Sequence, residues 1–164
     1  MGPDDTRLLL RAVEVAQRAR DDGNHPFGAV LARSGEVLLE AGNTVTTERD
    51  VTGHAELNLV RLASREYPED VLADCTLYSS TEPCAMCAGA IYWSGIGRVV
   101  YALSEAELGR FTGADAENPT MHLPARTVLA AGQRSIEVEG PAGLPEAAAV
   151  HEDFWVPERE SRGS

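Results

Sequence analysis

Two short motifs in the sequence combine residue types that bind metals with one that can transfer protons. In "HAE", Glu56 follows His54 by two residues, and in "PCAMC", Cys84 and Cys87 follow Pro83. On its own, a Cys-x-x-Cys pair could be a disulfide or redox pair, half of a structural zinc site, or part of a catalytic one. One imidazole and two thiolates supply three of the four ligands of zinc. Three ligands are typical of a catalytic site, because a structural site fills all four positions.

Glu56 gives the combination of motifs its expected chemistry. An open position on zinc takes a water and makes it acidic enough to ionise near neutral pH. Glu56 lies on the same helical turn as His54, within reach of such a water, and is well placed as a proton shuttle. Two alternatives remain open from the residues alone. Cys75 could complete a structural zinc site or be a small buried core residue, and Glu56 could simply favour the start of a helix.

Hydrophobic periodicity predicts the elements that position these motifs. Helices are expected over residues 5–23, 54–67, 83–95 and 145–155. Two strands joined by a tight turn at Ser34-Gly35 are expected within 26–43, and three more over 74–80, 98–103 and 134–140. Polar loops are expected over 43–53 and 105–124. Each motif starts a helix, with Pro83 in the first turn of its helix and Gly95 ending it.

This order of elements predicts an α/β fold, a three-layer α/β/α sandwich around a central mixed five-stranded sheet. We expect one domain over residues 1–156, followed by a mobile polar tail at 157–164. Because junctions between strands and helices gather at one edge of such a sheet, where ligands usually bind, one imidazole and two thiols could converge there.

Composition narrows the class of protein. The 164 residues carry a formal net charge of -12, which disfavours a nucleic-acid partner, since phosphate binding needs a basic surface. No stretch is apolar enough for a membrane span, and arginines interrupt the apolar start, so we expect neither a span nor a signal peptide. Three cysteines without an export signal indicate a reducing, cytoplasmic setting.

The order His-x-Glu, then Pro-Cys-x-x-Cys, matches the signature of zinc deaminases. The sequence resembles the cytidine deaminase superfamily, and is most similar to the branch that holds guanine deaminases, fungal-type cytosine deaminases and tRNA adenosine deaminases. The resemblance spans residues 8–103, and its clearest parts are "PFGAVL", "GNTVTTERDVTGHAE" and "TLYSSTEPCAMCAGAIYWSGIGRVVYA". It implies the cytidine deaminase-like fold, hydrolytic deamination of an aminated ring, and a homodimer.

The resemblance also implies roles for individual residues. It makes His54, Cys84 and Cys87 the ligands of one Zn²⁺ per chain, and Glu56 the proton shuttle. The remaining roles concern the substrate. Asn43 would contact the base, and the backbone amide of Ala55 would bind its carbonyl.

Four aromatic residues have positions that the resemblance places near the pocket. Phe27 and Trp93 match pocket-lining positions, although either could serve as core, and Trp93 could also contact a second subunit. Phe154 and Trp155, in "HEDFW", are similar to the aromatic C-terminal lids of guanine and cytosine enzymes. Alternatively, Phe154 and Trp155 could only pack the last helix and not cover the pocket.

Guanine is the substrate that the resemblance favours, because "GAIYW" and the stretch before "HAE" are closest to bacterial guanine deaminases. The segment "FTGADAENPTMHLPA" does not match the corresponding segment of guanine deaminases. Cytosine, a pterin, a triazine or a nucleoside therefore remains a possible substrate. A carboxylate or a pair of carbonyl groups is needed to read the N–H edge of guanine. The candidates, which the sequence does not rank, are Asp115, Glu117, Glu152 and Asp153. A tRNA adenosine deaminase and a non-catalytic zinc-stabilised module remain alternatives. His25, His122 and His151 have no metal-binding spacing, with His122 a possible substrate contact.

Overall fold

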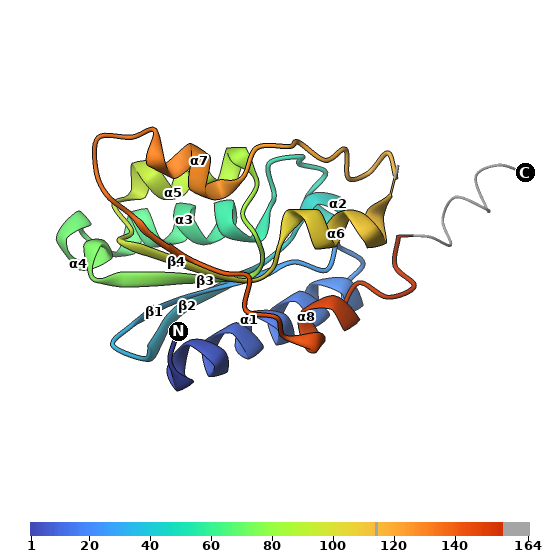
Figure 1. Cartoon of the computed structure of the whole chain (residues 1–164), viewed down its shortest axis with the longest axis horizontal. Helices are drawn as coiled ribbons and strands as arrows, with labels where there is room; N and C mark the ends of the chain where they lie inside the picture. Colours follow the sequence, from blue (N-terminus) through green and yellow to red (C-terminus); the bar gives the residue numbers. More distant parts are fainter. Residues whose placement is uncertain (114, 156–164) are drawn as a thin grey trace, which may run out of the picture.

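The computed structural model describes residues 1–113 and 115–155. A five-stranded sheet with the order β2-β1-β3-β4-β5 forms its centre (Figure 1). The strands are β1 (Gly28–Arg33), β2 (Glu36–Gly42), β3 (Cys75–Thr81), β4 (Arg98–Leu103) and β5 (Glu137–Glu139). β1 runs antiparallel to both of its neighbours, whereas β3, β4 and β5 are parallel to one another. The predicted mixed five-stranded sheet is confirmed.

Helices cover both faces of the sheet, which confirms the three-layer arrangement (Figure 1). One face carries α1 (Pro3–Asp21) and α8 (Pro145–Ala149), and the other carries α3 (Ala55–Glu66), α5 (Ala85–Ser94) and α7 (Ala125–Ala130). The apolar core is accordingly divided into two clusters, one under each helical layer. None of the described helices combines the length and apolarity needed to cross a bilayer.

The connections between strands place both motifs. The two-residue turn at Ser34 and Gly35, with φ of 52° and 79°, joins β1 to β2 as predicted. β3 then leads into α5, which crosses over to the parallel strand β4. In such a crossover the helix begins at the carboxyl end of the first strand. Cys84 therefore lies at that edge of the sheet.

Hydrophobic periodicity did not predict several short helices. α2 (Val45–Glu48), α4 (Glu69–Ala73) and α6 (Glu105–Thr112) lie in segments without a predicted helix, and so does α7. The loop prediction for 105–124 is thus wrong over its first eight residues. These helices are eight residues or shorter and bury two residues at most, so each has too few turns for a hydrophobic period to be recognised from the sequence.

The ends of the predicted helices differ slightly from those in the structure. Pro83 precedes the N-cap residue Cys84 instead of lying in the first turn of α5, whereas Gly95 ends that helix with φ of 90°, as predicted. The last helix ends at Ala149, and a left-handed φ of 59° at Asp153 prevents a helix through the segment after it. The predicted tail at 157–164 lies outside the described residues.

Candidate metal centre and active site

Both motifs lie at the start of a helix, as the sequence predicted. His54 is the N-cap residue of α3, and Cys84 is the N-cap residue of α5, with Cys87 one turn further along. α3 and α5 pack side by side on one face of the sheet. Their packing brings together side chains that lie thirty residues apart in the sequence.

The three predicted ligand residues form one compact group. His54 Nδ1 lies 3.4 Å from Cys84 Sγ and 3.6 Å from Cys87 Sγ, and the ligand atoms all lie within 4.8 Å of one another. Zinc bonds of about 2.3 Å to sulfur and about 2.0 Å to nitrogen, at tetrahedral angles, separate such ligand atoms by roughly 3.5 Å. The group therefore fits one zinc ion.

The pKa values of the two thiols also indicate a metal-binding site. A hydrogen bond from the Cys87 thiol, together with His54, lowers the pKa of Cys84 to about 4. The Cys84 thiolate and burial raise the pKa of Cys87 well above its usual value. The two adjacent thiols therefore cannot both ionise near neutral pH unless a cation lies between them. This is the behaviour expected of ligands for a divalent metal.

Cys75 does not belong to this group. It begins β3, at the end of the strand opposite to the edge where Cys84 lies, and the metal-binding group in the described part of the chain does not include it. Its thiol donates to the carbonyl oxygen of Val71 at 3.3 Å, and burial raises its pKa. The structure thus places Cys75 in the core and not in a four-ligand site.

Glu56 lies next to the metal-binding group and is 5% exposed. Burial, with the Cys84 thiolate adding to it, raises the pKa of its carboxyl group. Ser79 Oγ lies 2.7 Å from Glu56 Oε1 and 2.6 Å from the carbonyl oxygen of Thr81. By rotating its hydroxyl, Ser79 can donate to the Glu56 carboxylate or accept from the protonated acid. Glu56 can therefore gain and lose a proton without losing this partner.

A cavity of about 540 Å³ opens above this centre. It is lined by His54, Cys84 and Glu56, and by Phe27 and Asn43, which the sequence had predicted. The outer wall comes from the stretch that follows β4, and its lining residues are Glu105, Leu108, Ala116, Glu117, Asn118, Pro119, Thr120 and Met121. The metal-binding group and the proton-transfer residue thus share one cavity with room for a small ring compound.

Two groups near the cavity are available as hydrogen-bond donors. Asn43 is 2% exposed, and its Oδ1 accepts from the Val45 N–H at 3.0 Å. This bond orients the side-chain amide and leaves its Nδ2 as a donor. Ala55, the first residue of α3, does not line the cavity with its side chain. Its backbone N–H is one of the first four in the helix, which have no partner within it.

Other predicted contacts do not reach the cavity. Trp93 is 83% exposed on α5 and is absent from the lining. Since it is not a core residue, the surface around it favours the predicted homodimer, which stays a prediction. Asp115 is buried, and its Oδ1 accepts from the Glu117 N–H at 2.9 Å, which shapes the wall. His122 likewise does not line the cavity.

Phe154 and Trp155 support the cavity from behind rather than covering it. Trp155 is 1% exposed, with ring centroids 5.1 Å from His25 and 6.1 Å from Phe27, two residues that line the cavity. Phe154 contacts His25 edge-on, at 5.9 Å between centroids. Neither aromatic lines the cavity itself. Their place in the described chain is therefore that of packing residues behind the site.

His151 makes this aromatic cluster sensitive to acid. It is 1% exposed, and its Nδ1 accepts from Trp155 Nε1 at 3.1 Å. Burial, with Arg20 nearby, lowers its pKa from 6.5 to about 4. The unfolded chain takes up a proton on this histidine near pH 6.5, whereas the folded chain does not. The stability that neutral His151 contributes is therefore fully present above pH 6.5 and is lost as the pH falls toward 4.

As the pH falls from 7 to 4.5, we expect the titration of His151 to lower the free energy of unfolding by about 2–3 kcal/mol. Urea unfolding of the protein and of His151→Gln, at both pH values, measures the contribution. The variant should show a smaller decrease, since glutamine does not titrate. Parallel decreases in both proteins would assign the acid sensitivity to other groups.

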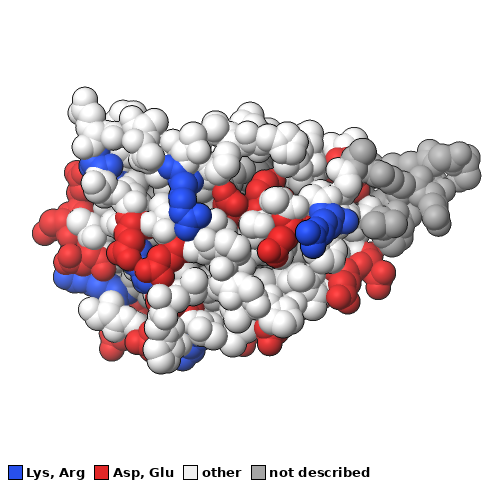
Figure 2. Space-filling view, in the orientation of Figure 1, with Lys and Arg blue, Asp and Glu red and all other residues white. Residues whose placement is uncertain are grey.

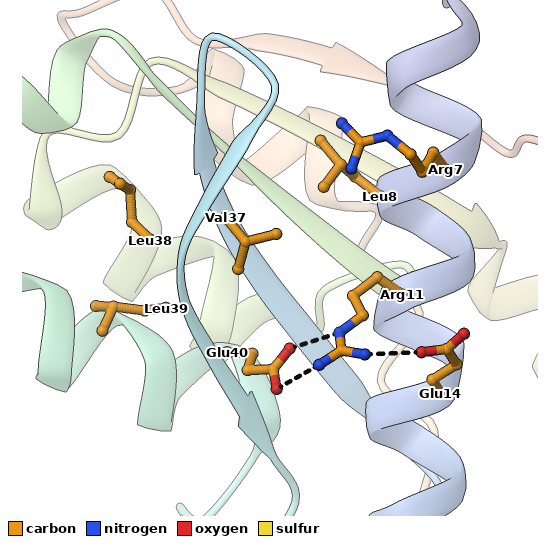
Figure 3. Close-up of a pocket in the computed structure, with 8 residues that line it drawn as sticks. All are labelled: Arg7, Leu8, Arg11, Glu14, Val37, Leu38, Leu39 and Glu40. Atoms are coloured by element: carbon orange, nitrogen blue, oxygen red, sulfur yellow. Dashed lines mark hydrogen bonds and ion pairs between the residues drawn. The ribbon is translucent and has the colours of Figure 1, made fainter.

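A second hollow, of about 730 Å³, lies between α1 and β2 on the other face of the sheet (Figure 3). Arg11 dominates it, but its guanidinium is bound to Glu40 at 2.9 and 3.1 Å and to Glu14 at 3.0 Å (Figure 3). The remaining arginine, Arg7, donates to the carbonyl oxygen of Gly35 at 2.8 Å. These paired charges join α1 to the β1–β2 hairpin. They offer neither a metal-binding group nor a proton-transfer residue like those of the first cavity.

Comparisons with known proteins agree with this geometry. The family model for the cytidine and deoxycytidylate deaminase zinc-binding region matches residues 3–103. A probable cytosine deaminase of Schizosaccharomyces pombe is 43% identical over 152 residues, which is 92% of each chain. A guanine deaminase of Bacillus subtilis is 43% identical over 101 residues, 61% of this chain and 65% of the relative.

Solved structures include a similar chain from work on tRNA:A34 deaminases, with 25% identity and a TM-score of 0.67 over 88% of this chain and 99% of that one. The similar proteins therefore differ in substrate and share the fold and the type of reaction. Since the family model covers both motifs, and one relative aligns along nearly its whole length, the chain belongs to the cytidine and deoxycytidylate deaminase family and is a zinc-dependent hydrolytic deaminase.

Proposed function

We propose that the protein hydrolyses the exocyclic amine of a free nucleobase and releases ammonia. The observation that carries this proposal is the group of His54, Cys84 and Cys87 at one cavity, beside the buried carboxyl group of Glu56. The reaction converts C–NH₂ and water to C=O and NH₃. It therefore needs a nucleophilic water, a group that moves protons and donors that hold the ring.

Each requirement has a residue to meet it. His54, Cys84 and Cys87 would hold zinc, which supplies an acidified water as the nucleophile when bound. Glu56 would take one proton from the attacking water and pass it to the ring nitrogen, and then take the second proton of that water and pass it to the amine, which leaves as ammonia. Burial raises the pKa of Glu56 above its usual value, which makes its carboxyl group a better proton acceptor. Asn43 Nδ2 and the Ala55 N–H are the donors for a carbonyl group of the substrate.

Guanine, the base expected from the sequence, and cytosine are the two leading substrates. The relative that is a guanine deaminase supports the first, but its similarity covers only 61% of this chain. The probable cytosine deaminase supports the second, with similarity over 92% of the chain. The outer wall of the cavity follows residue 103, so the longer alignment includes the part that reads the substrate. This coverage makes cytosine the second candidate to test beside guanine.

Charge argues against a tRNA substrate. The chain carries a net charge of -12, and on the face drawn in Figure 2 the basic side chains stand apart, separated by acidic and uncharged surface. Binding of RNA draws its affinity from phosphate contacts and weakens steeply with salt. A small neutral base needs no such surface.

We expect ammonia release from guanine or cytosine, and none from adenosine in a tRNA anticodon stem-loop. A coupled ammonia assay over guanine, cytosine, adenine, their nucleosides, pterins, triazines and an anticodon stem-loop RNA tests this, with the zinc content measured on the same sample. Silence toward every free base, from protein with one zinc per chain, would overturn the proposal. Activity on RNA alone would establish the tRNA alternative instead.

A further inference from the structure

Four carboxyl groups line the cavity, and three of them already have partners. Glu56 interacts with Ser79. Glu82 accepts from two backbone N–H groups, those of Glu105 at 3.1 Å and Ala125 at 3.0 Å. Glu117 lies 3.5 Å from His25 Nε2. The fourth, the carboxyl group of Glu105, has no hydrogen bond or ion pair with any described residue.

The backbone around Glu105 is held firmly. Glu105 is the first residue of α6, directly after the N-cap residue Ser104, whose hydroxyl accepts from the Glu107 N–H at 3.1 Å. Its own N–H donates to Glu82, which immediately precedes Pro83 and Cys84. Glu82 also binds the N–H of Ala125 at the far end of the outer wall. The wall that carries Glu105 is thus fixed directly to the metal-binding motif.

The groups around Glu105 favour its protonated form on balance, although His54 acts in the opposite direction. Burial first, then the nearby Cys84 and Glu82, raises the pKa of its carboxyl group to about 7. A half-buried carboxyl group without a donor is costly, because hydrogen bonds to water are lost and none replaces them. A ligand that brings an N–H group would satisfy it.

We propose that Glu105 accepts a hydrogen bond from the ring N–H that distinguishes a free base from its nucleoside. This inference rests on the proposed function and assigns the residue that sets its specificity. Cytosine carries this hydrogen at N1 and guanine at N9, where a nucleoside has its sugar instead. A site built around such a bond rejects an analogue that lacks the hydrogen, because the acceptor is then left unpaired. Glu105 is thus a specificity-determining residue, not a proton shuttle.

Methylated bases isolate this single hydrogen bond. The test compares kcat/KM for cytosine with that for 1-methylcytosine, and for guanine with that for 9-methylguanine, in the protein and in Glu105→Leu. Leucine is one atom shorter than glutamate, is apolar and accepts no hydrogen bond. We expect the preference for the unmethylated base to fall by roughly 10- to 100-fold, the factor expected for a hydrogen bond to a charged group. Glu105→Gln keeps an acceptor oxygen and should lose less.

Glu107→Leu is the matched control, since Glu107 lies in the same helical turn but does not line the cavity. It should keep the full preference. An unchanged preference in Glu105→Leu, or equal loss for both members of a pair, would overturn the assignment while leaving base deamination intact. Absence of activity on every free base would instead overturn the proposed function, and this assignment with it. Zinc content and circular dichroism confirm that each variant is folded.

Discussion

The Glu56→Gln variant is expected to lose kcat by at least about a thousandfold while retaining its fold and its zinc. General acid–base residues contribute roughly 10²- to 10⁴-fold, and Glu56 is expected to serve several proton transfers in one turnover. Glutamine has the same shape and still offers Ser79 an acceptor at the position that Glu56 Oε1 occupies. It cannot carry a proton from water to the leaving amine. Ammonia release under saturating substrate measures the loss.

Glu66→Gln is the matched control for this prediction. Glu66 is the last residue of the same helix, α3, and is exposed. It should leave kcat unchanged. If Glu56→Gln kept a tenth or more of the activity, another group would be moving the protons. If it also lost zinc, Glu56 would be helping to hold the metal, and its loss of activity would not report on proton transfer.

The metal-binding group was predictable because its signals are local. Each motif lies within five residues and begins a helix, so the sequence itself sets where His54, Cys84 and Cys87 stand on their helices. The only tertiary information required was that α3 and α5 lie side by side. The connection from β3 to β4 fixes the edge of the sheet at which α5 begins. β2, which precedes α3, ends at the same edge, because β2 and β3 are both antiparallel to β1.

The residues that surround the substrate were harder to predict because they depend on distant contacts. Ser79 is an ordinary strand residue in the sequence, and only the tertiary fold, which brings β3 close to the start of α3, places its hydroxyl 2.7 Å from Glu56. Glu105 lay in a segment expected to be a loop. One signal could have revealed it, since a serine followed three residues later by glutamate, as in "SEAE", is a typical helix start.

The same distinction explains which predicted substrate contacts lie away from the cavity. Trp93 was selected by resemblance to relatives, and Asp115 by the chemistry of its carboxyl group in a segment that departs from them. Neither argument gives the direction of the side chain. In this chain Trp93 points outward from α5, and Asp115 turns into the wall to accept the Glu117 N–H. Asn43 and Phe27 kept their predicted places because both adjoin strands of the sheet, whose register fixes them.

Removal of the metal is expected to abolish activity and to lower the melting temperature together. Zinc would join the start of α3 to the first turn of α5, and it would allow both thiols to ionise. A ligand present at a thousand times its Kd stabilises the native state by about 4 kcal/mol, which is roughly 10 °C for a domain of this size. Thermal unfolding and ammonia release, followed before and after treatment with a chelator, measure both effects. Added Zn²⁺ should restore them.

Two cysteine variants separate the catalytic site from a structural one. Cys87→Ser should reproduce the effect of the chelator, because it removes a fully buried ligand. Cys75→Ala should keep its zinc and its activity, because Cys75 lies outside the metal-binding group at the far end of β3. Loss of zinc from Cys75→Ala would mean that four protein ligands close the site. No position would then be open for water, and the protein could not deaminate by the route that His54, Cys84, Cys87 and Glu56 support.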